Sequence, residues 1–212
     1  MSDPRDELAR AGAHLAALGL SPGSSGNLSV RIGEQVLITP TGTDLSRIAP
    51  DKLSVLDLTG AHLDGPRPSK EFPLHTAFYR RNPDARAVVH LHSRHAAAVS
   101  CLPPYSERTA IPPVTPYFVM RVGQTPLLPY AAPGDAGQAE DMERLPFPFR
   151  AVLLANHGPV VAGASMAAAV DTAVELEETS ALLLALGTRQ IRLLTADDAE
   201  TLAARYDSPW GG

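Results

Sequence analysis

Two spacings of apolar residues alternate along the chain, and each predicts a different element. Apolar residues that recur every three or four positions predict helices over residues 4–18, 71–81, 94–101, 166–186 and 196–206. Shorter alternating or wholly apolar runs predict strands over residues 28–32, 35–39, 54–58, 87–92, 151–155 and 160–162. Strands and helices therefore follow one another, which is typical of an α/β protein with helices layered on a sheet. Hairpin-length connections are as common as crossovers, so we expect a mixed sheet rather than a plain dinucleotide-binding fold.

The stretch between residues 103 and 149 shows few such patterns and is rich in proline. Because proline fixes φ and has no N–H donor, we expect this stretch to be mostly loop and extended chain. Just before it, Cys101 ends an alanine-rich helix and is expected to be a small buried hydrophobe. In the long helix at 166–186, Glu175, Glu177 and Glu178 are expected on the solvent-facing side.

Composition narrows the class of protein. At 212 residues, with 44% hydrophobic and 19% charged residues, we expect one domain over residues 1–212 with a substantial core. A net charge of −5 without a run of Lys or Arg argues against a nucleic-acid partner. The apolar runs are too short to span a membrane, and the charged N-terminal residues lead into no signal-peptide core, so we expect a cytoplasmic protein. The single cysteine excludes an internal disulfide and a cysteine-based zinc knuckle.

Three of the seven histidines are candidate metal ligands. His90 and His92 lie two residues apart in a predicted strand, so their rings leave the same face about 6.5–7 Å apart at the backbone. Both rings can then reach one ion at about 2 Å from each imidazole nitrogen. His157 is the candidate third ligand, because a loop after the strand at 151–155 can present it. Imidazole and carboxylate ligands suit Zn²⁺, with Co²⁺, Ni²⁺ or Mn²⁺ as alternatives.

A structural interpretation of the histidines stays open at this point. A His-x-His pair in a strand is more often a surface or hydrogen-bonded pair than a metal site, and His95 in the next helix competes as a ligand. His14, His62 and His75 have the surroundings of ordinary helix and loop histidines. The residues alone therefore leave both interpretations available.

Three short polar turns in the first half of the chain are candidate anion-binding segments. They are residues 24–27 (SSGN), residues 39–43 (TPTGT), and Ser69 with Lys70 where a helix begins. Hydroxyls, backbone N–H groups and a helix N-terminus can together hold a phosphate, although any one such turn alone is usually structural. Glu71 follows directly. It is either a carboxylate favoured by the helix N-terminus or a metal ligand that leaves the ion to act as a base.

In this order, five motifs of the chain resemble the class II aldolase/adducin family. The motifs are SSGNLSVR (24–31), TPTGTDL (39–45), PSKE (68–71), VVHLHS (88–93) and LLANHGPVVAG (153–163). The resemblance extends from about residue 5 to residue 186. It implies a three-layer α/β/α class II aldolase-like fold with a central mixed, mainly antiparallel sheet. It also implies a homotetramer with active sites at the subunit boundaries.

The same resemblance implies roles for individual residues. His90, His92, His157 and, without substrate, Glu71 would hold the ion. The substrate phosphate would be held by Ser24, Ser25, Gly26, Asn27, Thr41, Gly42, Ser69 and Lys70. Tyr117 matches the place where the aldolase supplies a tyrosine from a neighbouring subunit, so Tyr117 and Glu71 are the candidate catalytic residues. At Lys70 the aldolase commonly has a second serine, which disfavours an L-fuculose-phosphate aldolase.

Within the family, three segments resemble the 3-oxo-tetronate 4-phosphate decarboxylases: VSCLP (99–103), IPPVTPYFVMRVG (111–123) and PLLPYAAPGD (126–135). The resemblance implies loss of CO₂ from a four-carbon β-keto acid phosphate to give dihydroxyacetone phosphate, through an enediolate that the metal stabilises as a Lewis acid. An L-fuculose-phosphate type aldolase or a pentulose-phosphate 4-epimerase would use the same site. A non-catalytic adducin-like domain would keep the fold without the ion, and a methylthio-sugar phosphate dehydratase would need a thioether pocket that the sequence does not indicate.

Overall fold

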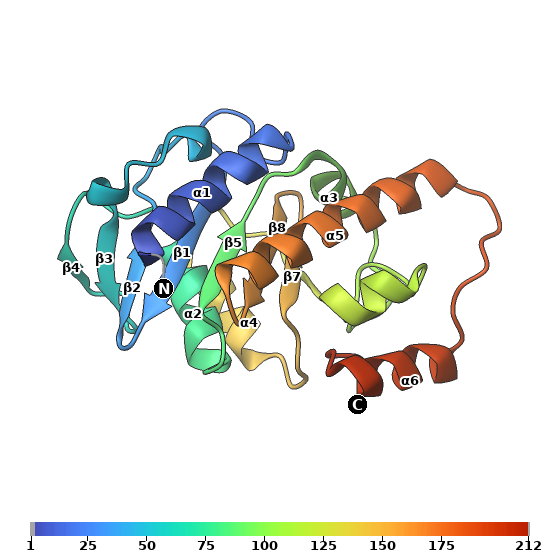
Figure 1. The fold of residues 1–212 in the computed structure, drawn as a ribbon. Coiled ribbons are helices and arrows are strands. Elements are labelled where there is room, and N and C mark those ends of the chain that lie inside the picture. Colours follow the sequence, from blue (N-terminus) through green and yellow to red (C-terminus); the bar gives the residue numbers. More distant parts are fainter. Residues whose placement is uncertain (1–2, 212) are drawn as a thin grey trace.

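A mixed sheet forms the middle layer of the computed structural model, which describes residues 3–211 (Figure 1). Within that range its strands are β1 (Asn27–Ile32), β2 (Gln35–Ile38), β3 (Ser54–Asp57), β4 (His62–Asp64), β5 (Ala87–His90), β6 (Leu127–Leu128), β7 (Ala151–Leu154) and β8 (Gly158–Gly163). Their order across the sheet is β4-β3-β2-β1-β5-β8-β7-β6. Neighbouring strands are antiparallel except the β6–β7 pair, which is parallel. The predicted mixed, mainly antiparallel sheet is therefore confirmed.

Helices cover the sheet on both sides. The helices are α1 (Pro4–Ala17), α2 (Phe72–Arg81), α3 (Arg94–Val99), α4 (Ala136–Arg144), α5 (Met166–Leu186) and α6 (Ala196–Tyr206). Short 3₁₀ turns η1 (Leu45–Arg47) and η2 (Pro50–Lys52) and the π-helical segment η3 (Phe118–Val122) lie in the connections. Within residues 3–211, no helix combines the length and apolar character that crossing a membrane requires.

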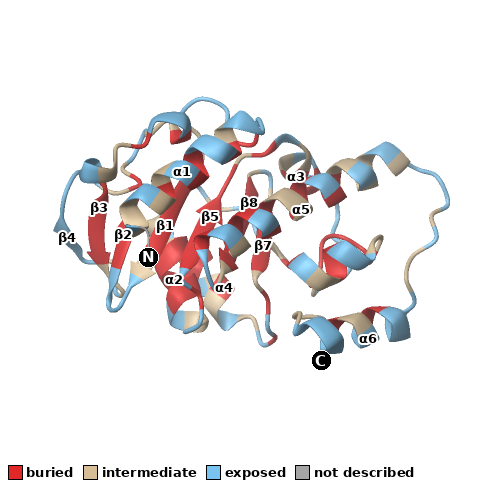
Figure 2. Ribbon diagram, in the orientation of Figure 1, coloured by how far each residue is buried: buried red, intermediate tan, exposed pale blue. Residues whose placement is uncertain are grey.

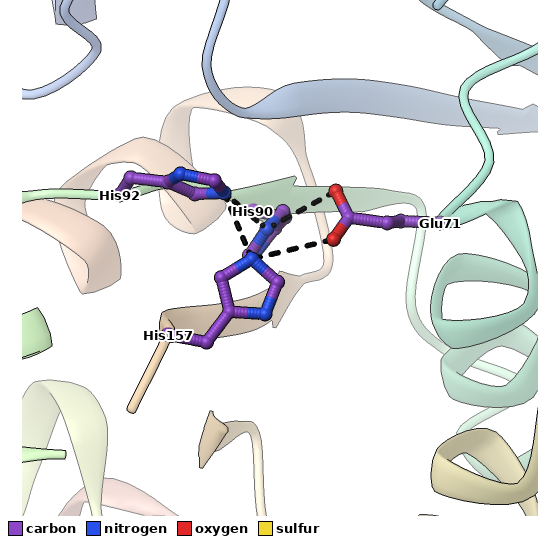
Figure 3. Close-up of side chains that lie close together, drawn as sticks. All are labelled: Glu71, His90, His92 and His157. Carbon is purple, nitrogen blue, oxygen red and sulfur yellow. Dashed lines mark hydrogen bonds and ion pairs between the residues drawn. The ribbon is translucent and has the colours of Figure 1, made fainter. Parts of the chain in front are cut away.

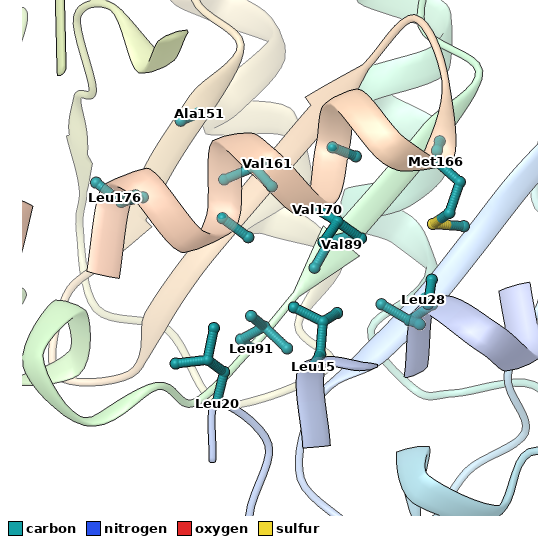
Figure 4. Packing of buried hydrophobic residues seen from close by; sticks show 14 of the residues in the cluster. Leu15, Leu20, Leu28, Val89, Leu91, Ala151, Val161, Met166, Val170 and Leu176 are labelled. Carbon is teal, nitrogen blue, oxygen red and sulfur yellow. The ribbon is translucent and has the colours of Figure 1, made fainter. Parts of the chain in front are cut away.

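One hydrophobic cluster lies between the sheet and helices α1, α3 and α5. Leu15 of α1 and Leu176 of α5 belong to it, together with Leu28, Val89 and Val161 from three adjacent strands (Figure 4). Alternation along each strand sends every second side chain to this face, as the sequence pattern predicts. The central strands are buried, whereas the outer sides of α1 and α5 carry exposed residues (Figure 2).

A second cluster lies on the opposite face, under α2 and α4. Leu74 and Phe78 of α2 and Met142 of α4 pack there against strand residues such as Val88 and Val152. Val88 and its neighbour Val89 thus point to opposite faces of β5. The two clusters and the sheet between them make the predicted three layers, helix on sheet on helix.

Side-chain caps mark the starts of α1, α4, α5 and α6. The Asp3 side chain accepts a hydrogen bond from the backbone N–H of Arg5, and Pro4 occupies the first turn of α1. Thr195 and Asp198 form a reciprocal capping box at the start of α6. The predicted bounds of α5 and α6 agree with the structure, and the other predicted helices and strands shift by a few residues at their ends.

Two expectations are wrong, and a third is incomplete. Most residues of the stretch at 103–149 lie outside helices and strands, as expected, but the stretch also contains η3, β6 and α4, which follows the cap residue Asp135. Cys101 is exposed, because α3 ends at Val99 and leaves the cysteine outside the core. Glu177 is buried rather than solvent-facing; its carboxylate accepts hydrogen bonds from the backbone N–H groups of His95 and Ala96 at the start of α3. The first N–H groups of a helix have no partner within that helix, so they can bind a buried carboxylate. Hydrophobic periodicity does not reveal such a partner.

Candidate metal centre and adjoining cavity

Four side chains from separate parts of the chain converge at one end of the central strands. Glu71 is the residue before α2, His90 ends β5, His92 follows two residues later, and His157 lies in the turn between β7 and β8. One ligand atom from each of the four lies within 4.8 Å of the other three. Figure 3 shows the three imidazoles and the carboxylate pointing toward one another. The convergence expected of His90, His92 and His157 is therefore present in the structure.

Contacts between these groups are short. His92 Nε2 lies 3.1 Å from His90 Nε2 and 2.9 Å from His157 Nε2. Glu71 uses both oxygens, with Oε2 at 3.3 Å from His90 Nε2 and Oε1 at 3.3 Å from His157 Nε2. As the N-cap residue of α2, Glu71 makes no side-chain hydrogen bond to that helix, so its carboxylate faces the histidines instead.

The register of the sheet brings these residues together. His90 pairs with Asn27 of β1 on one side and with Val160 of β8 on the other. The turn before β8 is held by hydrogen bonds from His157 N to Leu154 O (3.0 Å) and to Ser100 Oγ (3.1 Å). A ring carried by this turn therefore has a fixed position beside the end of β5.

The protonation of the rings suits metal binding. His90 Nδ1 lies 2.8 Å from the carbonyl oxygen of Pro159, which can only accept, so Nδ1 carries the proton and the Nε2 lone pair of a neutral ring faces the cluster. Burial and the nearby His90 lower the pKa of His92, and they lower the pKa of His157 to about 4. Burial alone would raise the pKa of Glu71, but interaction with His90 and a hydrogen bond from Asn27 hold it well below its usual range.

This donor set fits a divalent cation. Two nitrogen lone pairs about 3 Å apart repel one another unless a proton or a cation lies between them, and a carboxylate beside them adds negative charge. Three imidazoles with one carboxylate are ligands of Zn²⁺ and neighbouring transition metals. The residues present therefore match a metal centre by their chemistry as well as by their spacing.

A cavity of about 380 Å³ opens beside the cluster, with Glu71 and His92 in its wall. Its lining includes every residue proposed to hold a phosphate: Ser24, Ser25, Gly26, Asn27, Thr41, Gly42, Ser69 and Lys70. The three polar turns, which are separated in the sequence, thus face one space. A larger cavity of about 530 Å³ lies elsewhere, around Arg150 and Asp207, and none of the predicted site residues lines it.

Not all polar groups of the smaller cavity are free to bind a ligand. Ser25 Oγ donates to the carbonyl oxygen of Pro22 (2.7 Å), whereas Ser69 Oγ accepts from the backbone N–H of Glu71 (3.3 Å) and keeps its own O–H donor for a ligand. The Asn27 amide lies between Glu71 and a buried histidine, His75, and bonds to both. Its side chain is therefore a partner of Glu71, which differs from the phosphate-binding role expected of it.

Two candidates from the sequence do not join this site within the chain. Tyr117 is 56% exposed, and the guanidinium of Arg121 lies over its ring, 5.2 Å from the ring centroid. Tyr117 is not among the described residues that line the cavity. His95 is not a competing ligand, because its Nδ1 bonds to Glu177 Oε1 at 2.8 Å. Tyr117 therefore keeps its candidate role only if a neighbouring subunit supplies it.

Sequence reasoning missed His75, which is fully buried and connected to the cluster. It was expected to be an ordinary helix histidine, but its Nε2 lies 2.5 Å from Asn27 Oδ1 and its Nδ1 lies 2.7 Å from Ser29 Oγ. A signal existed: His75 lies four residues after Glu71, about one helical turn further along the same side of α2.

Comparison with known proteins agrees with this geometry. The family model for the class II aldolase and adducin N-terminal domain matches residues 6–184. The chain is 46% identical over 200 residues to a 3-oxo-tetronate 4-phosphate decarboxylase of Pectobacterium atrosepticum, a match that covers 94% of this chain and 92% of that protein. It is 34% identical over 172 residues to an L-fuculose phosphate aldolase of Escherichia coli strain K12, covering 80% and 77%. The crystal structure of YgbL from Klebsiella pneumoniae superposes with a TM-score of 0.90 at 45% identity, over 94% of this chain and 97% of that one, which confirms the predicted fold.

We expect the metal-free protein to lose stability as the pH falls below about 6.5, where unfolded histidines take up a proton. Burial, with the nearby His90, lowers the pKa of His75 to about 3, so the folded ring stays neutral and acid favours the unfolded state. His75 alone should then remove about 2 kcal/mol of unfolding free energy between pH 7 and pH 5. Urea unfolding with a chelator at both pH values measures this loss.

His75→Gln cannot take up that proton, so its loss over the same pH interval should be smaller by about the same amount. His14→Gln, at an exposed position of α1, is the matched control and should keep the wild-type pH dependence. An acid-induced loss as large in His75→Gln as in the wild type would contradict the assignment of a neutral buried ring.

Proposed function

Because the chain belongs to the class II aldolase and adducin family, we propose that it is a metal-dependent carbon–carbon lyase that decarboxylates 3-oxo-tetronate 4-phosphate to dihydroxyacetone phosphate and CO₂. One observation carries this proposal: the cluster of Glu71, His90, His92 and His157 opens into a cavity lined by all eight candidate phosphate-binding residues. Its 46% identity to an enzyme of that name supports the choice of reaction within the family.

Glu71, His90, His92 and His157 would hold the metal. Zn²⁺ is the ion we propose, with Co²⁺, Ni²⁺ or Mn²⁺ as alternatives, since imidazole nitrogens with a single carboxylate suit this group of ions. When bound, the cation would supply Lewis acidity at the ketone oxygen, where negative charge develops as CO₂ leaves. The hydrogen bond from His90 to Pro159 and the turn around His157 hold two of the rings in place for this task.

The cavity would orient the substrate through its phosphate. Gly26 and Gly42 have φ values of +79° and +74°, a conformation that lets neighbouring backbone N–H groups point at one anion. Lys70 is exposed at the rim and adds a full positive charge. Binding energy from the phosphate, which does not react, then positions the carbons that do.

The reaction needs one proton. As the bond between the carboxylate carbon and C2 breaks, its electron pair moves toward the ketone and leaves an enediolate, and C2 must then be protonated to give dihydroxyacetone phosphate. Glu71 lines the same cavity and is the first candidate for this step: once the substrate displaces it from the ion, its carboxylate could take up a proton from solvent and deliver it to C2. Tyr117 is the second candidate acid, acting from a neighbouring subunit.

The assembly follows from the same proposal. Residues 1–212 would act as one domain, since one sheet and the helices on both of its faces span the described chain. A homotetramer with active sites at subunit boundaries would bring the exposed Tyr117 of one copy to the cavity of another. A phosphorylated four-carbon keto acid does not cross membranes freely, which favours a cytoplasmic enzyme.

We expect CO₂ release when the purified protein, loaded with each candidate metal, meets the D- and L-, erythro- and threo-3-oxo-tetronate 4-phosphates. Trapping CO₂ and measuring dihydroxyacetone phosphate with a coupled dehydrogenase quantifies the reaction from both products. At least one stereoisomer should give the two products in equal amounts. Aldehyde release from L-fuculose 1-phosphate without any CO₂ from the keto acids would replace the proposal with an aldolase.

Lys70→Ala should raise KM for the keto-acid phosphate about tenfold and leave kcat nearly unchanged, because a charge-assisted hydrogen bond to a non-reacting phosphate is made equally before and during the reaction. Lys52→Ala is the matched control, since Lys52 is exposed in η2, away from the cavity. Steady-state kinetics of both variants test this expectation. An unchanged KM in Lys70→Ala would remove Lys70 from the phosphate site.

A further inference from the structure

A continuous row of buried polar side chains lies behind Glu71, and the proposed reaction gives no role to its inner members, His75, Ser29 and Tyr79. Asn27 Nδ2 lies 2.8 Å from Glu71 Oε2, and His75 Nε2 lies 2.5 Å from Asn27 Oδ1. Ser29 Oγ lies 2.7 Å from His75 Nδ1 and 2.7 Å from the hydroxyl of Tyr79. All five residues are buried. The row is therefore a connected hydrogen-bond network that starts at the candidate metal centre and ends inside the protein.

Regular spacing on two elements builds this row. Asn27 and Ser29 are two residues apart on β1, so their side chains share one face, opposite the face of Leu28. His75 and Tyr79 are four residues apart on α2, so they share the side of the helix that faces β1. The network thus ties the helix that begins beside Glu71 to the strand next to β5.

The carboxylate at one end decides the direction of every hydrogen bond. An ionised Glu71 can only accept, so Asn27 must present its NH₂ group to Oε2 and its carbonyl oxygen to His75. That oxygen can only accept, so His75 must donate from Nε2. Its Nδ1 then accepts from the hydroxyl of Ser29, which in turn accepts from the hydroxyl of Tyr79. All four bonds donate toward Glu71, an arrangement in which each bond polarises the next.

The ionisation states of the inner groups agree with this direction. Burial raises the pKa of the Tyr79 phenol above its usual range, so the phenol keeps its proton and can donate. Burial, together with the nearby His90, lowers the pKa of His75, so this ring is neutral with one donor and one acceptor nitrogen. A charged His75 would donate from both nitrogens and would reverse the bond to Ser29.

We propose that His75 is a positioning residue: as the neutral tautomer with the proton on Nε2, it fixes the orientation of the Asn27 amide, which holds Glu71 Oε2 at the metal centre. The role rests on the proposed metal site. An amide rotated by half a turn would place its carbonyl oxygen against the carboxylate and replace a charge-assisted hydrogen bond with repulsion. The donor at His75 Nε2 prevents that rotation, because the rotated amide would present NH₂ to an N–H group.

The first experiment reads the tautomer directly. Protein with ¹⁵N-labelled histidine, with and without Zn²⁺, gives long-range ¹H–¹⁵N correlations that distinguish a proton on Nε2 from one on Nδ1. The His75 signals are assigned by their loss in His75→Gln. We expect a neutral ring with the proton on Nε2 at pH 7. A proton on Nδ1, or a charged ring at that pH, would overturn the proposal whatever the activity of the enzyme.

The second experiment measures the affinity for Zn²⁺ by competition with a chelator, without substrate. His75→Leu should weaken binding about 10–100-fold, the usual cost of losing a group that orients a metal ligand. His75→Gln keeps a donor for Asn27 and an acceptor for Ser29, so it should restore affinity to within about threefold of the wild type. Tyr79→Phe removes only the far end of the network and should have an effect between those of Gln and Leu.

Thr76→Val is the matched control, because Thr76 is a buried neighbour on α2 whose hydroxyl bonds, among residues 3–211, only to carbonyl oxygens of its own helix, at Phe72 and Pro73. The Thr76→Val variant should bind Zn²⁺ with the affinity of the wild type. His75→Leu binding as tightly as Thr76→Val, or His75→Gln binding as weakly as His75→Leu, would overturn the positioning role. If His75→Leu does not fold, the Gln variant and the tautomer decide the matter.

Failure of this proposal and failure of the proposed function give different results. If the protein releases no CO₂ but the variants show the expected order of Zn²⁺ affinities, the decarboxylase proposal is wrong and the positioning role of His75 stands. A wild-type protein that binds no Zn²⁺ would overturn both the metal centre and the positioning role. CO₂ release from a protein whose His75 carries its proton on Nδ1 would keep the reaction and overturn the inference.

Discussion

Imidazole nitrogens that face one another beside a buried carboxylate need a proton or a cation between them, and the elements around the site are arranged so that all four groups meet at one point. His92 Nε2 lies 3.1 Å from His90 Nε2 and 2.9 Å from His157 Nε2, with Glu71 in reach of two of the three rings. A proton can be shared by only two of these groups at a time, whereas a divalent cation can bind all four at once. The same charge would sit where a keto acid develops negative charge as it loses CO₂, so one interaction serves both the folded site and the proposed chemistry.

The sheet meets this constraint by bringing distant segments close to β5. Its two neighbours are β1, whose Asn27 binds Glu71, and β8, which follows the turn that carries His157. Close approach of backbones makes two glycines necessary here. A Cβ on Gly26 would lie 2.7 Å from the carbonyl oxygen of His90, and one on Gly158 would collide with the carbonyl oxygen of Leu91. The glycines of the SSGN and NHGP motifs therefore allow the strands and turns around the cluster to come together, apart from any contact with a ligand.

Helices, strands and the faces of their side chains follow from local sequence patterns and could be predicted. Contacts between residues that are distant in the sequence could not. Alternation predicts His90 and His92 on one side of a strand, and the family resemblance carried by the motifs implies that Glu71 and the polar turns join them. In the structure β5 ends at His90, and the chain that follows it brings His92 to the cluster. Periodicity places His75 toward the sheet but does not show that Asn27 and Ser29 meet it there. Glu177 was expected in solvent, because its charge does not reveal the unpaired N–H groups of α3 that it binds. The two-residue strand β6, inside the proline-rich stretch, forms because it pairs with β7. So short a strand has no recognisable pattern in its own sequence.

Anomalous X-ray scattering tests the central claim most directly, since it locates a metal without reference to activity. Crystals of the wild-type protein grown with Zn²⁺ would be measured on both sides of the zinc absorption edge. The account predicts one strong anomalous peak about 2.0–2.1 Å from the Nε2 atoms of His90, His92 and His157, with Glu71 as the nearest carboxylate. A map without a peak among these rings, or with His157 turned away from an ion held by the other two, would contradict it.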